Sequence, residues 1–282
     1  MTESNLAIDR STLAASFSKA ANDYDALAQI QFKTGCELLA WANQHSQFAT
    51  TSQQAKLLLD LGCGTAQLNR QLQQQWPQAH ILGLDLAQGM LQQAKRGHLA
   101  VSNSWLCADA ELLPLADQSI DAIYSNFALQ WCELDKVMVE AKRVLKPQGQ
   151  LLFTTLLEGT LAELQFAWQQ ADSKLAATVG KSVSASASVH VNRFLNQQQA
   201  LDTIEQHFPE IQFQTVTYTE FFPDVFSLMR SIKGIGARNL NSGRANGLTG
   251  KQRLAAMQQA YETLRTEQGL PLSWQVLMIT RT

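Results

Sequence analysis

A short turn carries the clearest chemical signal in the 282-residue sequence. It reads Asp60-Leu61-Gly62-Cys63-Gly64-Thr65-Ala66 and continues from the apolar run 57–61. Glycine adopts backbone conformations that other residues avoid, and without a Cβ it lets a ligand approach the main chain closely. Such a glycine pair also occurs in ordinary turns, but a strand before it and a helix after it favour a binding site.

Two carboxylates follow the next two apolar runs. Asp85 ends the run 81–85, and Asp109 ends the run 105–109. A carboxylate at such a strand end can accept both hydroxyls of a ribose, and the second acid is placed to take the exocyclic amine of an adenine. Each acid alone could instead cap the helix that follows it. Both acids beside a glycine turn favour a nucleoside site.

The turn differs from a dinucleotide fingerprint, because Gln67 stands where the third glycine of Gly-x-Gly-x-x-Gly would be. It resembles the Asp/Glu-x-Gly-x-Gly-x-Gly motif of class I S-adenosylmethionine-dependent methyltransferases. The resemblance extends over about 55–156 through the runs 83–91, 109–114, 127–131 and 143–149. One departure is Ala66, which stands where the family usually has its third glycine. We expect its methyl group to be tolerated, although it could narrow the pocket beside the methionine part of the cofactor.

This resemblance implies S-adenosylmethionine as methyl donor and S-adenosylhomocysteine as product. By motif position, Asp85 would hold the ribose, Leu86 and Met90 would flank the adenine, and Asn126 would face the methionine end. The implied cofactor-binding residues are Asp60, Gly62, Gly64, Ala66, Asp85, Leu86, Met90, Asp109, Ala110 and Asn126.

The flanking segments carry a second, narrower resemblance. It rests on the runs 17–31, 126–132, 153–156 and 190–195, and above all on Arg230-Ser231-Ile232-Lys233-Gly234-Ile235-Gly236-Ala237. Together they resemble the malonyl-[acyl-carrier-protein] O-methyltransferases of biotin synthesis, the BioC family. This resemblance implies methyl esterification of the free malonyl carboxylate on an acyl carrier protein, which starts pimeloyl and biotin synthesis.

Basic residues concentrate in the segment 225–261, which contains no Asp or Glu. It carries Arg230, Lys233, Arg238, Arg244, Lys251 and Arg253, although the whole chain has a net charge of -2. Acyl carrier proteins are strongly acidic, so this segment could steer and hold a malonyl-acyl carrier protein. The alternatives are a solvated basic helix face or a nucleic-acid patch. We expect no nucleic-acid partner, because aromatic residues are not interleaved with these charges.

A carboxylate acceptor needs no general base, since a carboxyl group with a reference pKa near 4 is already ionised at pH 7. The negative charge of this carboxylate and the positive charge of the sulfonium group of S-adenosylmethionine both decrease toward the transition state. A closed site without water therefore favours the reaction. We therefore expect no catalytic residue in the strict sense. The candidates for holding the carboxylate are Arg193, Arg230 and Lys233, with Tyr24 shaping a lid. Arg193 could also be an ordinary surface arginine, and Tyr24 a half-buried core residue.

Alternating strands and helices must position these residues. Apolar runs at 57–61, 81–85, 105–109, 120–125 and 151–155 are separated by helical stretches at 66–76, 87–96 and 133–145, and Pro147-Gln148-Gly149 predicts the turn into the fifth strand. Two more strands are expected near 211–219 and 273–280, with helical insertions before and after the sixth strand. This pattern predicts an α/β Rossmann-like class I methyltransferase fold with a seven-stranded, mostly parallel sheet. We expect one domain over 1–282, with a helical lid at 1–56, a cofactor-binding core at 57–156 and helical substrate-binding insertions within 157–282.

Composition limits the cellular setting. Hydrophobic residues make up 45% of the chain and charged residues 16%, which predicts a folded domain rather than a disordered chain. The sequence shows no membrane-length apolar run and no signal-peptide pattern at Met1, so we expect a cytoplasmic protein without a membrane partner. Cys36, Cys63, Cys107 and Cys132 lack metal-site spacing, and no metal is expected.

Other functions remain open at this point. The protein could methylate a free di- or tricarboxylic acid or a quinone, and a basic lid segment would suit a free acid too. It could also bind the cofactor without catalysis. A nicotinamide-dependent oxidoreductase is disfavoured by Gln67.

Overall fold

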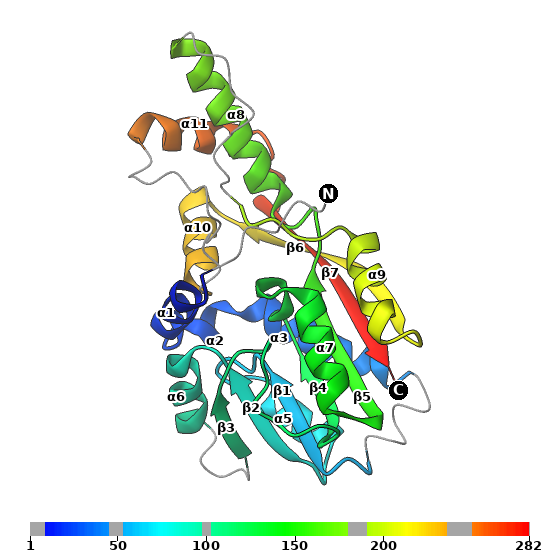
Figure 1. Ribbon diagram of the computed structural model, residues 1–282. Helices are drawn as coiled ribbons and strands as arrows, with labels where there is room; N and C mark the ends of the chain where they lie inside the picture. Colours follow the sequence, from blue (N-terminus) through cyan, green and yellow to red (C-terminus); the bar gives the residue numbers. More distant parts are fainter. Residues whose placement is uncertain (1–8, 45–52, 98–102, 180–190, 236–249, 282) are drawn as a thin grey trace.

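The computed structural model describes residues 9–44, 53–97, 103–179, 191–235 and 250–281 (Figure 1). One sheet of seven strands runs through it, in the order β3-β2-β1-β4-β5-β7-β6. Strands β1 to β5 pair in parallel, and β7 runs antiparallel to both β5 and β6. The expected Rossmann-like sheet is confirmed. Its strands are β1 (Leu57–Leu61), β2 (His80–Asp85), β3 (Asn103–Cys107), β4 (Ile120–Ser125), β5 (Leu145–Leu156), β6 (Gln212–Phe222) and β7 (Leu270–Arg281).

Helices connect these strands, and two pairs of helices form the insertions expected around the sixth strand. The helices α8 and α9 precede β6, and α10 and α11 follow it. The helices are α1 (Arg10–Ala20), α2 (Tyr24–Leu27), α3 (Gln29–Ala42), α5 (Asn69–Gln75), α6 (Gln88–Gly97), the short 3-10 helix η1 (Leu129–Trp131), α7 (Leu134–Val144), α8 (Ala162–Val179), α9 (Gln197–His207), α10 (Val225–Gly234) and α11 (Lys251–Glu262).

Several boundaries differ from the sequence prediction. Within the expected helical segment 1–56, the chain is interrupted between α2 and α3 at Ala28, whose φ of -87° and ψ of 40° are not helical. The third strand lies at 103–107, so Asp109 lies two residues beyond its end rather than at it. Pro147-Gln148-Gly149 was expected to form a turn before β5. It lies instead inside β5, where the pairing with β4 shifts register between Ile120 and Ala122. The extra residues are accommodated as an irregularity in the strand.

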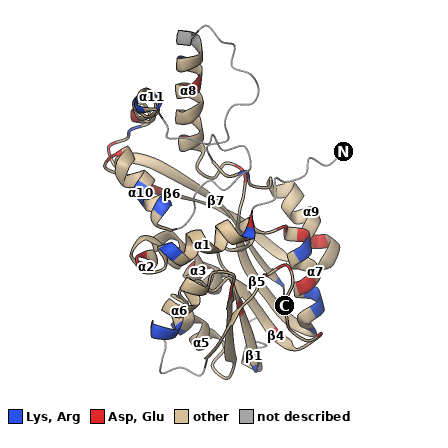
Figure 2. Ribbon diagram, turned by 60° about the vertical axis from the view of Figure 1, so that its left-hand side comes forward, with Lys and Arg blue, Asp and Glu red and all other residues tan. Residues whose placement is uncertain are grey.

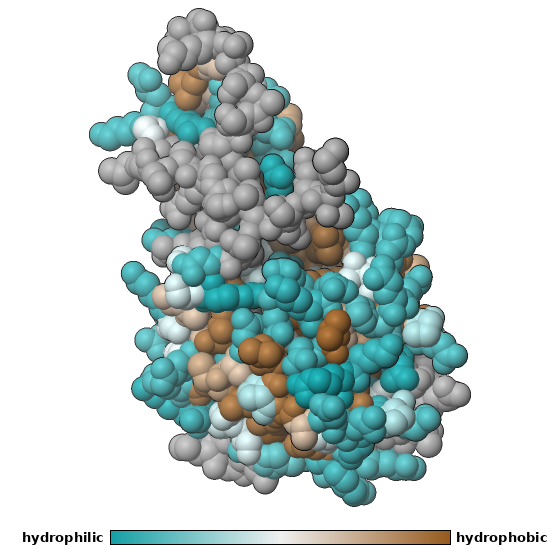
Figure 3. Space-filling view, viewed as in Figure 1, coloured by the Kyte–Doolittle hydropathy of each residue, from teal (hydrophilic) through white to brown (hydrophobic). Residues whose placement is uncertain are grey.

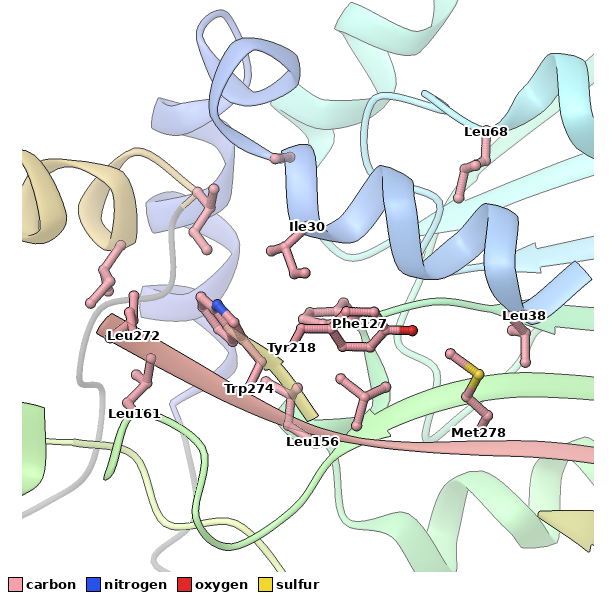
Figure 4. Close-up of a cluster of buried hydrophobic side chains, with 14 of the residues drawn as sticks. Ile30, Leu38, Leu68, Phe127, Leu156, Leu161, Tyr218, Leu272, Trp274 and Met278 are labelled. Atoms are coloured by element: carbon pink, nitrogen blue, oxygen red, sulfur yellow. The ribbon is translucent and has the colours of Figure 1, made fainter. Parts of the chain in front are cut away.

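Side chains alternate along each strand, so apolar residues point to both faces of the sheet, and helices cover both faces. On β5, Leu152 and Leu156 pack into one core cluster, whereas Leu151 and Phe153 pack into the other. The first cluster includes side chains from α3, α5, α8, α10 and α11. Figure 4 shows part of it, with Ile30 and Leu38 of α3 facing Trp274 and Met278 of β7. The second cluster includes side chains from α7 and α9.

The helices α8 and α11 extend away from the sheet, beyond the ends of β6 and β7 (Figure 1). They are joined by an ion pair between Arg253 of α11 and Asp172 of α8 at 2.6 Å, and Lys174 Nζ donates to Gln259 Oε1 at 3.0 Å. On the face seen in Figure 1, apolar side chains reach the surface between α6 and α7 (Figure 3). Among the described helices, none is both long and apolar enough to cross a bilayer.

Candidate functional site

The turn after β1 has the backbone geometry that its glycines permit. Gly62 has a φ of 73° and Gly64 a φ of 56°, both in the left-handed region. The Gly62 and Cys63 amides donate to the Leu84 carbonyl of β2 at 2.7 and 3.0 Å, which fixes the turn against the sheet. A Cβ on Gly62 would lie 2.3 Å from the Ala128 Cβ, so no larger residue fits there. A Cβ on Gly64 would meet only a Tyr24 ring carbon, 4.0 Å away.

Ala66 continues this pattern with a less favourable residue. Its φ is 60°, so an alanine stands where the left-handed backbone favours glycine. The residue is 1% exposed and packs inside the protein, and it lines neither of the two cavities that border the turn. The methyl group therefore strains the backbone at Ala66 itself. A role of Ala66 beside the cofactor remains a prediction.

A main cavity lies in front of the turn, at the carboxyl ends of β1, β2 and β4. The helix α1 covers it with Leu13, Ala14 and Phe17. Eight of the ten predicted cofactor residues line it, together with Tyr24: Gly62, Gly64, Asp85, Leu86, Met90, Asp109, Ala110 and Asn126. The structure thus brings together residues from four separate parts of the chain.

Asp85 and Asp109 make the hydrogen bonds of a capping residue while also lining this cavity. Asp85 accepts from the Gly64 amide at 2.8 Å and from the Ala87 amide at 2.7 Å, so it ties the glycine turn to the start of α6. Burial raises the pKa of Asp85, against the opposing effect of these two hydrogen bonds. Asp109 accepts from the Glu111 amide at 2.9 Å. The capping and ligand-binding interpretations are therefore compatible for Asp85. For Asp109 the helix-capping interpretation is wrong, because a turn and not a helix follows it before β4.

Arg10 of α1 is a site residue that the sequence did not reveal. Its Nε lies 3.3 Å from Asp109 Oδ2, its Nη2 pairs with Glu111, and its Nη1 donates to the Trp131 carbonyl at 2.8 Å. Phe17 of the same helix packs edge-to-face on Trp131, with ring centroids 5.6 Å apart. These contacts fasten α1 across the end of the cavity that Asp109 lines. Because the partners lie about 100 residues away in the sequence, no local pattern indicates them.

A smaller rear cavity lies behind the glycine turn and collects buried polar groups. Asp60, Gln31, Tyr124, Tyr24 and Asn126 line it. Asp60 is 5% exposed, and burial together with the charge of Asp85 raises the pKa of its carboxyl to about 7. Within the described part of the chain, neither the Tyr124 hydroxyl nor Gln31 Oε1 has a hydrogen-bond partner. Buried polar atoms without partners point to a ligand that would supply them.

The loop after β4 is held by hydrogen bonds to α3 and to β5. Asn126 donates from Nδ2 to the Gln31 carbonyl at 2.8 Å and accepts at Oδ1 from the Thr154 hydroxyl at 2.9 Å. Phe127 has a φ of 53°, and its amide donates to the same Thr154 hydroxyl at 3.0 Å. A phenylalanine in the left-handed region is strained, and such strain gathers at functional sites.

The predicted acceptor residues do not share one cavity. Arg193 is exposed and lines a third, side cavity with Leu129, Gln130 and Thr155. Arg230 and Lys233 are exposed on α10 and line none of these three cavities. Of the remaining basic segment, Arg238 and Arg244 lie outside the described residues. Arg253 is neutralised by Asp172, so it does not add a free charge to the segment.

Comparison with known proteins agrees with this geometry. Residues 59–153 match the model of a family described as a methyltransferase domain. The chain is 40% identical over 275 residues to a malonyl-[acyl-carrier protein] O-methyltransferase of Yersinia pestis, covering 96% of this chain and 91% of that protein. It is also 43% identical over 279 residues to the biotin biosynthesis bifunctional protein BioHC of Saccharophagus degradans. This match covers 95% of this chain but only 46% of the longer relative.

A solved structure supports the fold independently of these sequence matches. The crystal structure of a putative methyltransferase from Bacillus halodurans aligns with a TM-score of 0.50 at 17% identity, over 84% of this chain and 99% of that one. At this identity the likeness speaks for the fold alone. The glycine turn, the acids around the main cavity and the nearly full-length sequence match lead to one assignment. The chain belongs to the malonyl-[acyl-carrier protein] O-methyltransferase family.

Proposed function

We propose that this protein transfers a methyl group from S-adenosylmethionine to the free carboxylate of a malonyl thioester carried by an acyl carrier protein. The observation that carries this proposal is the match to the Yersinia pestis enzyme, which spans 96% of this chain at 40% identity. The main cavity also supports the proposal, because residues that could bind the nucleoside part of the cofactor line it together. The methyl ester would begin the synthesis of the pimeloyl chain of biotin, and the protein would work in the cytoplasm.

The cavities fit S-adenosylmethionine at both of its ends. Asp85 can accept the ribose hydroxyls, while Leu86 and Met90 offer apolar surface for the adenine. The rear cavity suits the methionine end, since the Asp60 carboxylate, the Tyr124 hydroxyl and Gln31 Oε1 can accept hydrogen bonds from its ammonium group. When bound, the cofactor supplies a sulfonium methyl group, which the carboxylate oxygen takes as the carbon–sulfur bond breaks and leaves a neutral thioether.

The protein contributes binding and exclusion of water rather than acid–base chemistry. The malonyl carboxylate has an ordinary pKa near 4, so no residue needs to remove a proton from it. Leu13, Ala14 and Phe17 of α1 cover the cavity, and a dry site favours a reaction in which two opposite charges disappear. Tyr24 lies between the main and rear cavities and shapes this cover. Burial and the nearby Asp85 and Asp25 raise the pKa of Tyr24, so its hydroxyl stays neutral.

We assign the role of holding the carboxylate to Arg193. It lines the side cavity, which shares Leu129 and Cys132 with the main cavity, and no ion pair engages it within the described residues. Arg230 and Lys233 are the other candidates from the sequence, but they lie on the exposed face of α10. Metal ions have no part in this mechanism.

The same α10 face suits the acyl carrier protein. Phe226, Arg230 and Lys233 are spaced by four and three residues, so they lie on one side of the helix. Phe226 is 59% exposed, and the two cations beside it give this side of the helix both apolar and basic groups. The basic positions of α10 are blue on the ribbon of Figure 2. An acidic carrier would be steered by the charges and held by the apolar contact. Within the segment 225–261, we therefore assign the docking of the acyl carrier protein to α10.

Mass spectrometry tests this function. Malonyl-acyl carrier protein and free malonate are each incubated with the protein and S-adenosylmethionine. We expect a gain of one methyl group on the carrier-bound malonyl alone. Methylation of free malonate alone would assign the protein to the free-acid methyltransferases. Cofactor binding without methylation of either acceptor would overturn the proposed acceptor.

A further inference from the structure

The side cavity lies where an acceptor could reach the methyl group from the surface. Its wall includes η1, the start of α7, the last residues of β5 and the segment 193–195. The segment is held in place by Leu195, which forms a parallel bridge with Leu157 and whose carbonyl accepts from the Glu158 amide at 2.9 Å. The cavity is therefore built by fixed elements at the carboxyl edge of the sheet.

The side cavity and the main cavity are neighbours. Leu129 and Cys132 line both of them, so η1 and the residue after it form the partition. The strained residue Phe127 precedes this partition and lines the main cavity. Because α1 covers the main cavity, a group entering through the side cavity could approach the methyl group without displacing the cofactor.

Gln130 gives the side cavity a specific polar group. Its Nε2 donates to the Phe127 carbonyl at 2.7 Å, which fixes the orientation of the side-chain amide. Its Oε1 is buried and has no partner within the described residues. An oriented, buried acceptor requires a donor from a ligand. The other polar residues of the cavity are Thr155 and Arg193, while Leu129, Leu134, Leu156, Phe194, Leu195 and Ala200 supply apolar wall.

We propose that the side cavity binds the thioester end of the pantetheine arm and that Gln130 Oε1 accepts a hydrogen bond from the first amide N–H of that arm. This inference rests on the proposed function. The first amide of pantetheine lies a few bonds beyond the thioester sulfur, so it can reach Gln130 while the malonyl carboxylate lies beside Arg193 and faces the main cavity at Leu129 and Cys132. The apolar wall suits the methylene groups between them. Gln130 would make the enzyme favour a pantetheine thioester over a free acid.

The test compares two small acceptors that differ by one group. One is malonyl-N-acetylcysteamine, whose amide N–H corresponds to that of the arm, and the other is its analogue with an ester oxygen in place of the N–H. We expect the wild-type protein to favour the amide in kcat/KM by about fivefold, since one hydrogen bond to a buried acceptor has about that effect. In Gln130→Leu the ratio should fall to about one, with the dissociation constant for S-adenosylmethionine unchanged.

Gln73→Leu is the matched control. Gln73 also donates from its side-chain amide to backbone carbonyls, including that of Trp76 at 3.2 Å, but it lies on α5, away from the three cavities. Its amide-to-ester ratio should equal that of the wild type. A wild-type ratio near one, or a ratio that survives Gln130→Leu, would overturn the assignment of the side cavity. If neither thioester nor malonyl-acyl carrier protein is methylated, the proposed function itself fails, which is a separate result.

Discussion

At the scale of single residues, the most informative feature is a buried acid that has no counter-charge within the described residues. Asp60 is 5% exposed, and burial together with Asp85 raises the pKa of its carboxyl to about 7. In a protein that binds a cationic cofactor, this arrangement makes sense if the ligand supplies the missing charge. We therefore expect Asp60 to be partly protonated near neutral pH in the free protein and ionised when the cofactor is bound.

Cofactor affinity should consequently depend on pH. An acid with a raised pKa is neutral below that pKa, so the ammonium group of the cofactor loses its partner as the pH falls through 7. We expect the dissociation constant for S-adenosylmethionine to increase by up to about tenfold between pH 8 and pH 6. Calorimetric titration across this range measures it. In Asp60→Asn the pH dependence should be flat over the same range, and a slope that persists there would assign the titration to another group.

Ala66 offers a test of backbone strain that is separate from chemistry. Its φ of 60° costs an alanine free energy that glycine does not lose, so Ala66→Gly should raise the free energy of unfolding by about 1 kcal/mol. Because its methyl group is buried outside both neighbouring cavities, cofactor affinity should change less than twofold. Denaturant unfolding and a binding titration measure the two quantities. A destabilised variant would show that packing of the methyl group outweighs the strain.

At the scale of elements, α1 forms part of the wall of the main cavity. It contributes apolar side chains to the cavity and is fastened at one end by Arg10. Near its other end, the Gly89 amide of α6 donates to the Ser18 hydroxyl at 3.1 Å. A Cβ on Gly89 would lie 2.7 Å from the Ser18 Cα, so α1 and α6 approach closely there.

Removal of the Arg10 side chain should loosen this cover. Arg10→Ala loses the interactions with Asp109 and Glu111 and the hydrogen bond to the Trp131 carbonyl. Because these groups are partly exposed, we expect a moderate effect: a roughly five- to tenfold faster release of S-adenosylhomocysteine. Stopped-flow fluorescence measures the release. Lys19→Ala, an exposed cation on the same helix, is the control and should release product at the wild-type rate. Equal rates in all three proteins would contradict a fastening role for Arg10.

At the scale of the whole molecule, the main cavity and the proposed docking face on α10 lie on different parts of the chain. The cavity is built on β1, β2, β4 and α1, whereas α10 belongs to the insertion between β6 and β7. Under the proposed function, small thioesters would need only the cavities, whereas a carrier protein would also need the α10 face. The two contributions can therefore be separated by the choice of substrate.

Charge reversal on α10 should affect only the large substrate. Arg230→Glu with Lys233→Glu should raise the KM for malonyl-acyl carrier protein by roughly tenfold at low salt and less at high salt, because exposed charges are screened. The KM for malonyl-N-acetylcysteamine should not change. The same reversal of Lys95 and Arg96 on α6 changes the net charge equally and serves as the control. An equal rise in KM for both substrates would place Arg230 or Lys233 in the cavity.

The sequence was most informative where neighbouring residues carry the signal. The strand before Gly62 and the acid Asp85 follow from short local patterns, and the mostly parallel sheet follows from the alternation of strands with helices. The shift of β3 by two residues and the irregularity around Pro147 depend on register against neighbouring strands, which no local pattern contains. Arg10 and the rear cavity depend on contacts between distant segments, so only the folded chain reveals them.

The most direct test of the proposed function is to determine which atom of the acceptor receives the methyl group. Malonyl-acyl carrier protein is incubated with the protein and methyl-labelled S-adenosylmethionine, and the isolated product is treated with mild base. We predict that the label joins the carboxylate oxygen as a methyl ester, which the base hydrolyses to release labelled methanol. Label that stays on the acyl carrier protein after this treatment would place the methyl group on carbon or nitrogen and contradict a carboxyl O-methyltransferase.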